Sequence, residues 1–550
     1  MVQHLTRYRR AWLRGDVLAG LTVAAYLVPQ VMAYATVAGL PPVTGLWAVL
    51  MPLALYPVLG SSRQLSVGPE STTALMTAVV VGPLAAGAPH RYAALAAGLA
   101  VVVGLLCLLC RLLRLGFVAD LLSRPILVGY LAGVAVIMIV GQLGKITGVP
   151  VSGEGVGAEL ASFVRGLSGV HLWTVLLSAA VLALLFLAQW RLPRFPAPLL
   201  AVLLATACVT LFGLERYGIK VVGPVPSGLP APALPALADL RNLLLPALGV
   251  LLVGYTDNML TARAFAAKHS QTIDANQELL ALGAANVGAG LFQGFPVSSS
   301  GSRAALADAA GARTQLYSLV CLAGVVAVLL FAGPLLADFP TAALGALVVF
   351  AAIQLIDVTA FRRLASFRRS ELLLALAALA GVLAFDILYG VLLAVGLSVV
   401  EMLARVARPH DAILGIVPGL AGMHDVDDYP QARTVPGLVV YRYDSPLFFA
   451  NAQNFLRRAL AAVDQQKEPV SWFVLNAEAN VEVDITALDA VESLRAELAR
   501  RGIVFAMARV KQDLRTSLDA FGLTEAIGED LLFPTLPTAV AAYERSKASS

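Results

Sequence analysis

The sequence predicts a polytopic α-helical membrane protein that ends in a small soluble α/β domain. The 550-residue chain is 59% hydrophobic and 13% charged, with a mean hydropathy of +0.80, whereas soluble chains carry about 25% charged residues. Long apolar stretches recur as far as residue 405, and charges return from residue 408 onward. This composition excludes an ordinary cytosolic enzyme, a disordered regulator and a fibrous protein. The net charge of +4 gives no reason to expect nucleic acid binding.

Twelve apolar stretches are candidates for bilayer-spanning helices, which need about 20 residues each. They cover residues 17–38, 43–60, 92–115, 119–144, 171–190, 197–214, 240–266, 276–293, 314–336, 340–357, 371–385 and 387–405. Two further apolar runs, 71–82 and 302–310, are too short to cross, and each follows a stretch rich in Gly, Pro and Ser. Broken segments in matching positions of two halves are typical of transporters, so we count fourteen segments.

The distribution of Lys and Arg favours fourteen segments over twelve. Cytoplasmic loops are enriched in these residues, and the fourteen-segment count with the N-terminus inside places most of them on that side. A twelve-segment count would move Arg111, Arg191 and Arg263 outside. We therefore expect a multi-pass protein of the cell membrane, with its N-terminus and its C-terminal domain in the cytoplasm.

The segments divide into two sets of seven, separated by the Pro-rich stretch 223–235. An odd number of crossings inverts the second set relative to the first, and inverted repeats support alternating access between two sides of a membrane. We expect a cytosolic segment at 1–16, a membrane domain at 17–405 with repeats at about 17–214 and 240–405, and a cytosolic domain at 408–550.

The two short segments predict an anion site at the middle of the membrane. The direction of the chain makes both short helices begin near the midplane, where their N-termini meet. Each N-terminus carries about half a positive elementary charge and unpaired N–H groups, an arrangement that binds anions. Glycine at Gly68 and Gly301 lets the backbone approach a ligand. Hydroxyl donors are available from Ser71, Thr72, Ser300 and Ser302.

Three charged residues fall inside the apolar stretches around this site. Arg303 either supplies a fixed positive charge for the anion or forms a structural ion pair with Asp257 or Glu70. We favour the anion site because an intramembrane charge is a functional hypothesis by default. The two acids either couple anion entry to proton uptake or are structural, Glu70 as a cap of its helix and Asp257 as a hydrogen bond between helices.

Gln30 and Tyr34 in the first segment complete the candidate site. Pro29 frees backbone groups and kinks the helix at this point. Gln30 and Tyr34 stand four residues apart, so they share one face of the helix.

Several motifs, in order along the chain, resemble the sulfate permease family of anion transporters. Residues 29–35 (PQVMAYA) with 38–42 (AGLPP) resemble one signature of the family, and residues 274–279 (DANQEL) with 300–303 (SGSR) resemble a second. Residues 437–442 and 447–452 resemble the opening of the family's C-terminal STAS domain.

The resemblance implies core and gate domains built from two inverted seven-segment repeats, often in a homodimer. It implies transport of small inorganic or organic anions, such as sulfate, bicarbonate, chloride or dicarboxylates. Family substrate positions correspond to Gln30, Tyr34, Gly68, Pro69, Asp257 and residues 300–303. The sequence departs from the family at two acids: many members have a small residue at Glu70 and glutamate at Asp257.

The C-terminal stretch predicts a small α/β sheet. Apolar strands are expected at 439–443, 472–475 and 504–507, and helices at 451–463 and 488–500. STAS domains of bacterial regulators carry a phosphorylatable Ser or Thr after an Asp, and the run Asp484-Ile485-Thr486 lies at about that position. We prefer the reading in which Asp484 caps a helix.

We expect a secondary active anion transporter, by proton symport in preference to anion exchange or a channel. A membrane-anchored regulatory protein is an alternative of another class. A nucleobase permease shares the architecture but does not need a cation such as Arg303. Cys107 and Cys110 lack further ligands for a metal site, and no nucleotide-binding fingerprint is present. We therefore expect no enzymatic activity, no metal and no cofactor.

Overall fold

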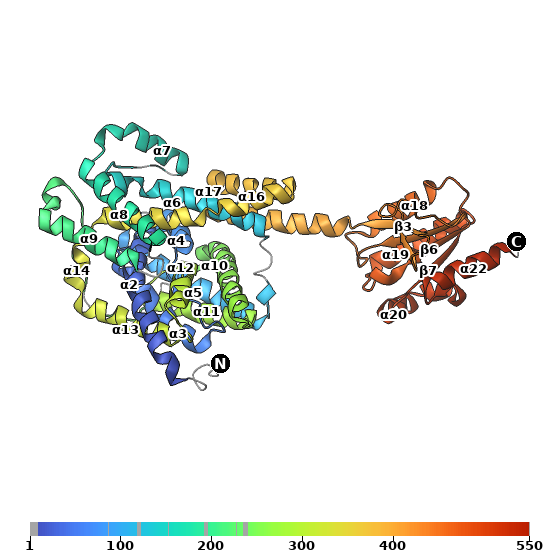
Figure 1. The fold of residues 1–550 in the computed structure, drawn as a ribbon, viewed down its shortest axis with the longest axis horizontal. Coiled ribbons are helices and arrows are strands. Elements are labelled where there is room, and N and C mark those ends of the chain that lie inside the picture. Colours follow the sequence, from blue (N-terminus) through green and yellow to red (C-terminus); the bar gives the residue numbers. More distant parts are fainter. Residues whose placement is uncertain are drawn as a thin grey trace. The chain divides into compact units, whose positions relative to one another are not determined.

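The computed structural model describes residues 9–548 except 86, 118–122, 152, 154, 192–195, 227 and 235–239. The chain divides into two compact units, Met1–Ser398 and Val399–Ser550. The first is almost entirely helical and the second is built on a sheet (Figure 1). Within the described residues, six helices are long and apolar enough to cross a membrane. Residues 1–8 of the expected cytosolic segment, and parts of the expected linker, lie outside the described residues.

The first repeat contains helices broken at the expected place by a two-residue strand. The elements of the first repeat are α2 (Leu13–Val37), α3 (Val43–Leu59), β1 (Val67–Gly68), α4 (Ser71–Ala85), α5 (Pro89–Leu112), α6 (Arg124–Thr147), α7 (Val156–Arg165), α8 (Leu172–Arg191) and α9 (Ala197–Phe212). The short helix α4 follows the strand β1, where the sequence predicts a broken segment.

The second repeat follows the same order, with two helices, a short strand and a short helix. Its elements are α10 (Leu240–His269), α11 (Ala275–Leu291), β2 (Ser298–Ser299), α12 (Gly301–Ala309), α13 (Leu316–Phe331), α14 (Gly333–Ala337), α15 (Thr341–Leu355), α16 (Val358–Phe367) and α17 (Arg369–Ala407). The helices α7, α14 and α16 are short additions that apolar length alone did not predict.

The last membrane element, α17, folds back on itself. A Cβ placed on Gly390 would lie 2.8 Å from the Cα of Val382, although eight residues of straight helix would separate the two by about 12 Å. A Cβ on Gly381 would likewise lie 2.8 Å from the side chain of Leu393. The backbone therefore reverses between Val382 and Gly390, in agreement with the two crowded segments expected at 371–385 and 387–405.

The membrane helices pack in two groups. The first contains α2–α5 and α10–α13, and α5 packs on α11 where a Cβ on Gly104 would lie 2.7 Å from the carbonyl oxygen of Gly283. The second contains α6, α8, α9 and α15, and α6 packs on α15 near Lys145 and Gly345. Glycine at such contacts lets two helix backbones approach closely, as is common between membrane helices.

A buried carboxylate locks the first group together. Glu278 is fully buried and accepts hydrogen bonds from Tyr56 Oη (2.9 Å), the N–H and hydroxyl of Ser61 (2.8 and 2.7 Å) and Asn258 Nδ2 (2.9 Å). The donors come from α3, the loop after it and α10. A buried carboxylate is tolerated when it is hydrogen-bonded this completely.

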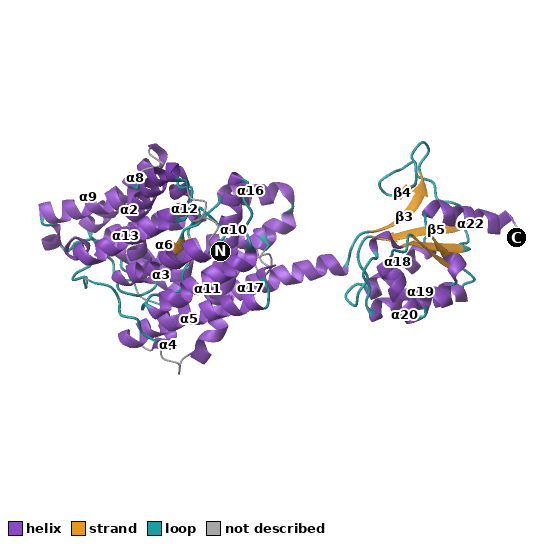
Figure 2. Cartoon of the chain, turned by 90° about the horizontal axis from the view of Figure 1, so that it is seen from below, coloured by secondary structure: helices purple, strands orange, loops and turns teal. Residues whose placement is uncertain are grey.

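The C-terminal unit is a six-stranded sheet in the order β4-β3-β5-β6-β7-β8. The strands β5 to β8 run parallel, and β3 is antiparallel to β4 and β5. Helices α18, α19 and α20 cover one face, and α22 covers the other (Figure 2). The elements are β3 (Asp411–Ile416), β4 (Met423–Asp425), β5 (Leu438–Tyr443), α18 (Ala452–Asp464), β6 (Trp472–Asn476), α19 (Ile485–Arg500), β7 (Val504–Ala508), α20 (Gln512–Phe521), α21 (Leu523–Ile527), β8 (Leu532–Phe533) and α22 (Leu536–Ala548).

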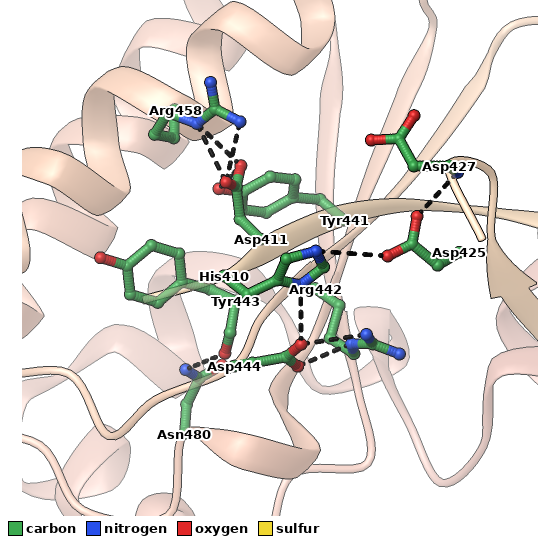
Figure 3. A network of polar contacts seen from close by, with 10 residues as sticks. All are labelled: His410, Asp411, Asp425, Asp427, Tyr441, Arg442, Tyr443, Asp444, Arg458 and Asn480. Carbon is green, nitrogen blue, oxygen red and sulfur yellow. Dashed lines mark hydrogen bonds and ion pairs between the residues drawn. The ribbon is translucent and has the colours of Figure 1, made fainter. Parts of the chain in front are cut away.

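A polar network links the first strands of this unit to α18 (Figure 3). Asp411 pairs with Arg458 at 2.8 Å and accepts a hydrogen bond from Tyr441 Oη at 2.8 Å. Burial, together with the Asp411 carboxylate, raises the pKa of Tyr443 to about 12. His410 lies between the carboxylates of Asp425 and Asp444, at 3.6 and 3.2 Å. These contacts fasten the start of β3 to its two neighbouring strands.

Candidate functional site

A two-stranded pairing brings the starts of the two short helices together. β1 pairs with β2 in antiparallel fashion, with Val67 opposite Ser299 and Gly68 opposite Ser298. The Ser300 N–H extends the pairing by donating to the Ser66 carbonyl at 2.8 Å. α4 begins at Ser71 and α12 at Gly301, directly after each strand. The two broken segments therefore meet through their backbones, as the sequence predicts.

A cavity of about 220 Å³ lies beside this pairing. Residues from α2, the start of α4, α10 and the start of α12 form one side, and residues from α6 and α15 form the other. The lining residues are Tyr26, Gln30, Tyr34, Glu70, Thr72, Leu131, Asp257, Thr261, Ser299, Gly301, Ser302, Ala351, Gln354 and Leu355. The cavity therefore lies between the two helix groups.

Seven of the residues predicted from the sequence line the cavity: Gln30, Tyr34, Glu70, Thr72, Asp257, Gly301 and Ser302. The other five lie behind them and are not part of its lining. Gly68 is in the strand pair, Pro69 bonds to Arg303, Ser71 bonds to Glu70, and Ser300 accepts a bond from the Arg303 N–H. These five position the cavity wall and do not form it.

Arg303 is fully buried behind the strand pair. Its Nη1 donates to the Pro69 carbonyl at 2.8 Å and to Gln30 Oε1 at 3.1 Å, and its Nε donates to the Ser66 hydroxyl at 3.3 Å. Among the described contacts, neither Glu70 nor Asp257 forms an ion pair with it. The ion pair with Glu70 or Asp257, one of the two sequence-based readings of Arg303, is therefore wrong for the described contacts. The guanidinium instead joins α12 to the turn before α4, where buried acceptors are available, and its role as the positive charge of the anion site stays a prediction.

The Arg303 contact orients a relay through Gln30 to Tyr34. A guanidinium only donates, so the Gln30 side chain must present Oε1 to Arg303 and Nε2 to the other side. Nε2 donates to Tyr34 Oη at 3.1 Å. The Tyr34 oxygen thus accepts from Gln30, and its own O–H remains available to donate. Tyr34 lines the cavity, where an anion would accept this proton.

Glu70 occupies the N-terminus of α4. Its Oε2 accepts hydrogen bonds from the Ser71 hydroxyl at 2.6 Å and from the Thr72 N–H at 2.9 Å. This is the geometry of a helix cap, so the positive end of α4 already faces a carboxyl group. The cap, one of the two readings of Glu70 from the sequence, is therefore present, and the N-terminus of α4 does not have the unpaired N–H groups expected for both short helices.

The N-terminus of α12 faces the cavity without such a carboxyl. The N–H groups of Gly301 and Ser302 find no acceptor among the described residues, as is typical of a first helical turn, and both residues line the cavity. Asp257 on α10 accepts from the Ser299 hydroxyl at 3.1 Å. The cavity thus combines one open helix end with two carboxyl groups.

Sequence reasoning missed four polar lining residues: Tyr26, Thr261, Ser299 and Gln354. Ser299 is the chain neighbour of the predicted Ser300. Tyr26 stands four residues before Gln30, and Thr261 stands four residues after Asp257, so helical spacing from a predicted residue could have found both. Gln354 near the end of α15 carries no such signal, because its helix belongs to the opposite group.

In the C-terminal unit, Asp484 caps α19 as preferred from the sequence. Its Oδ1 accepts from the Ala487 N–H at 2.8 Å, and its Oδ2 accepts from the Phe449 N–H at 2.7 Å. The second bond ties the loop after β5 to α19. Among the described residues, no cluster of three or more His, Cys, Asp or Glu could hold a metal ion.

Comparisons with known proteins agree with this architecture. The sulfate permease family matches residues 13–378, and the STAS domain matches residues 429–539. The chain is 63% identical over 547 residues to "Probable sulfate transporter MT1781" of Mycobacterium tuberculosis (strain CDC 1551 / Oshkosh), covering 99% of this chain and 98% of that one. It is 30% identical over 544 residues to "Sulfate transporter 4.1, chloroplastic" of Arabidopsis thaliana, covering 96% of this chain and 79% of that one.

Solved structures of low sequence identity share the fold. A murine solute carrier 26 family member A9 anion transporter has a TM-score of 0.90 at 22% identity, covering 99% of this chain and 93% of that one. The transmembrane domain of a cyanobacterium bicarbonate transporter has a TM-score of 0.61 at 23% identity, covering 71% of this chain and 98% of that one. From its sequence and its fold, the chain is a multi-pass membrane protein of the sulfate permease family with a C-terminal STAS domain.

Proposed function

We propose that this protein is a secondary active transporter of small anions, of the sulfate, bicarbonate or dicarboxylate class, coupled to protons. The observation that carries the proposal is the open N-terminus of α12 at a cavity between two helix groups. The relatives named as sulfate transporters support sulfate as the first anion to test.

The cavity offers donors suited to an oxyanion. The N–H groups of Gly301 and Ser302, the Ser302 hydroxyl and the Tyr34 O–H all belong to residues that line it. Helix N-termini and hydroxyls bind sulfate and carboxylate groups in this way. A volume of about 220 Å³ accommodates one small anion with a few waters, each of which takes about 30 Å³.

The two acids in the cavity support proton coupling. Glu70 and Asp257 would repel an anion when both are ionised, and protonation of either removes one negative charge from the cavity. An anion and a proton would then enter together and leave together. This is the electrostatic basis of a symporter, and it uses Glu70 at the α4 cap and Asp257 beside Ser299.

Movement of one helix group against the other would expose the cavity to each side in turn. Inverted-repeat transporters work by such rocking around a fixed site. We further propose that the protein resides in the cell membrane as a homodimer, with the N-terminus and the STAS domain in the cytoplasm. The clustering of Lys and Arg on that side supports this orientation.

Uptake of radiolabelled sulfate into proteoliposomes tests the proposal, with and without an inwardly directed proton gradient and with a panel of competing anions. Symport predicts accumulation that collapses with the gradient. Uptake that requires an internal anion would indicate exchange, and flux that only follows the electrochemical gradient of the anion would indicate a channel. No uptake of any anion in the panel would contradict the proposal.

A chain truncated after Arg408 separates transport from regulation by the STAS domain. We expect the membrane domain to contain the whole transport site, since every described lining residue of the cavity precedes residue 356. A regulatory protein whose working part is the STAS domain would instead show no anion flux in either form.

A further inference from the structure

A second cavity, of about 560 Å³, lies at the other end of α6 and α15. It is enclosed by the last turns of α6, α7, the start of α8, the η4 turn (Leu214–Tyr217) and the start of α15. The lining residues are Gly141, Gly144, Lys145, Gly148, Val149, Pro150, Val151, Glu159, Gly169, His171, Thr174, Gly218, Lys220, Thr341 and Ala342. None of these residues lines the central cavity.

The described lining residues carry two lysines and one carboxylate. Lys145 is half-buried on α6, packs against Gly345 of α15 and has no carboxylate partner among the described residues. The backbone of Lys220 is fixed beside α15, because its carbonyl oxygen accepts from the Thr341 N–H at 2.9 Å and hydroxyl at 3.1 Å. Glu159 is the described acid, and it makes an interaction of its own. The described lining of the cavity therefore carries an excess of positive charge.

His171 adds a side-chain donor whose orientation the structure defines. The Thr174 N–H donates to His171 Nδ1 at 3.3 Å, and the Thr174 hydroxyl lies 2.7 Å from the same nitrogen. With Nδ1 as an acceptor, the ring proton is on Nε2. Nε2 faces Gly218, where a Cβ would lie 3.3 Å away. Glycine at this position, with φ of +93°, leaves the Nε2–H accessible.

The same two helices connect this cavity with the central one. Leu131 in the central cavity and Lys145 in the outer one are both on α6, and fourteen residues of helix span about 21 Å. On α15, Thr341 lines the outer cavity and Gln354 lines the central one, and thirteen residues of helix span about 20 Å. The two cavities therefore lie in series along the contact between α6 and α15.

We propose that the outer cavity, defined by Lys145, His171 and Lys220, is an entry site that binds small inorganic oxyanions before they reach the central cavity. The inference rests on the proposed transport function and adds a second anion site to it. A cationic cavity raises the local concentration of anions and speeds their association, and salt screens the effect. By chain direction, this cavity lies on the side of the membrane opposite the N-terminus.

Kinetics of sulfate uptake test the entry site. The double variant Lys145→Gln/Lys220→Gln should raise the KM for sulfate roughly tenfold at low ionic strength and leave kcat near wild type. The difference should shrink at high salt. Glu159→Gln should lower the KM. Arg216→Gln is the matched control, because Arg216 is an exposed cation on η4 that does not line the cavity. An unchanged KM in the double variant, or an equal rise in the control, would overturn the proposal.

A thiol placed in the cavity provides a readout that does not depend on transport. A Cβ on Gly169 would meet nothing within 4 Å, so Gly169→Cys fits without strain, in a background where the partly or fully exposed Cys110 and Cys208 are serine. A negatively charged, sulfonate-bearing methanethiosulfonate should react with this thiol faster than its positively charged trimethylammonium counterpart. Sulfate in solution should slow the reaction of the sulfonate reagent. Neutralising both lysines should abolish that preference.

The two experiments separate this proposal from the proposed function. A charge-independent reaction at Gly169→Cys, in a protein that still accumulates sulfate, would remove the entry site and leave transport intact. A charge preference in a protein that transports none of the anions tested would leave the cationic cavity standing while the transport proposal fails.

Discussion

Arg303 Nη1 donates a hydrogen bond to the carbonyl oxygen of Pro69 at 2.8 Å, across 234 residues of sequence. This bond joins the first turn of α12 to the turn that leads into α4. Gly68 is needed beside it, since a Cβ there would lie 2.8 Å from Val49 Cγ2 and 3.3 Å from Arg303 Nη2. The guanidinium therefore holds the two short helices in register and supplies positive charge from behind the cavity wall.

Arg303→Ala should destabilise the membrane domain and abolish sulfate uptake. The substitution leaves the Pro69 carbonyl and Gln30 Oε1 buried without a donor, and each unsatisfied group costs about 1–3 kcal/mol. Arg303→Lys keeps the charge but lacks the planar guanidinium that reaches several acceptors. The melting temperature and uptake of this variant should lie between those of the wild type and those of Arg303→Ala. Both are measured on purified protein and in proteoliposomes. An alanine variant with wild-type stability and uptake would remove Arg303 from the site.

Tyr34→Phe should raise the KM for the transported anion about tenfold, and it should lower the melting temperature by no more than the loss of the single buried bond from Gln30 Nε2 explains. The change removes the O–H that Gln30 leaves free to donate into the cavity, and a hydrogen bond to a charged group is worth about 1.5–3 kcal/mol. Tyr56→Phe is the matched control, because Tyr56 is an equally buried tyrosine that bonds to Glu278. That control should lower stability and leave KM unchanged; the reverse pattern would contradict the assigned roles.

Glu70→Gln and Asp257→Asn should flatten the pH dependence of uptake. In the wild type, lowering the external pH protonates the cavity carboxyls and should increase accumulation of the anion. A variant that permanently lacks one of these charges cannot bind a proton at that position. Its uptake should therefore depend less on the external pH. Uptake is measured at several external pH values with the internal pH held constant. If both variants keep the wild-type profile, the coupled proton binds elsewhere or is not transported.

Gly129→Ala should prevent α6 from packing correctly against α17. A Cβ on Gly129 of α6 would lie 1.9 Å from the carbonyl oxygen of Ala375 in α17, and backbone atoms cannot shift cheaply to make room. Overpacking of this kind costs about 1–3 kcal/mol or more. Gly141→Ala on the same helix is the control, since a Cβ there meets nothing within 4 Å. Thermal unfolding should show a lower melting temperature for Gly129→Ala and not for Gly141→Ala.

Much of the fold could be predicted because it depends on local patterns. The interruptions before Ser71 and Gly301 come from runs of Gly, Pro and Ser, and the structure begins α4 and α12 there. The Asp484 cap and the shared face of Gln30 and Tyr34 also follow from spacing along one element. Cavity residues that lie one helical turn from a predicted residue, such as Tyr26, were within reach of the same reasoning.

The amino-acid sequence by itself determined that the chain crosses a membrane, where its helices break and which residues share a helix face, because apolar length and periodicity are properties of contiguous residues. Tertiary packing decided that Arg303 faces Gln30 and Pro69 and not the cavity, that Glu70 closes its own helix end, and that Gln354 joins the site from the opposite helix group. The physical reason is that a buried polar group bonds to whichever partner the packing of distant segments brings within about 3 Å, and no local pattern contains that distance.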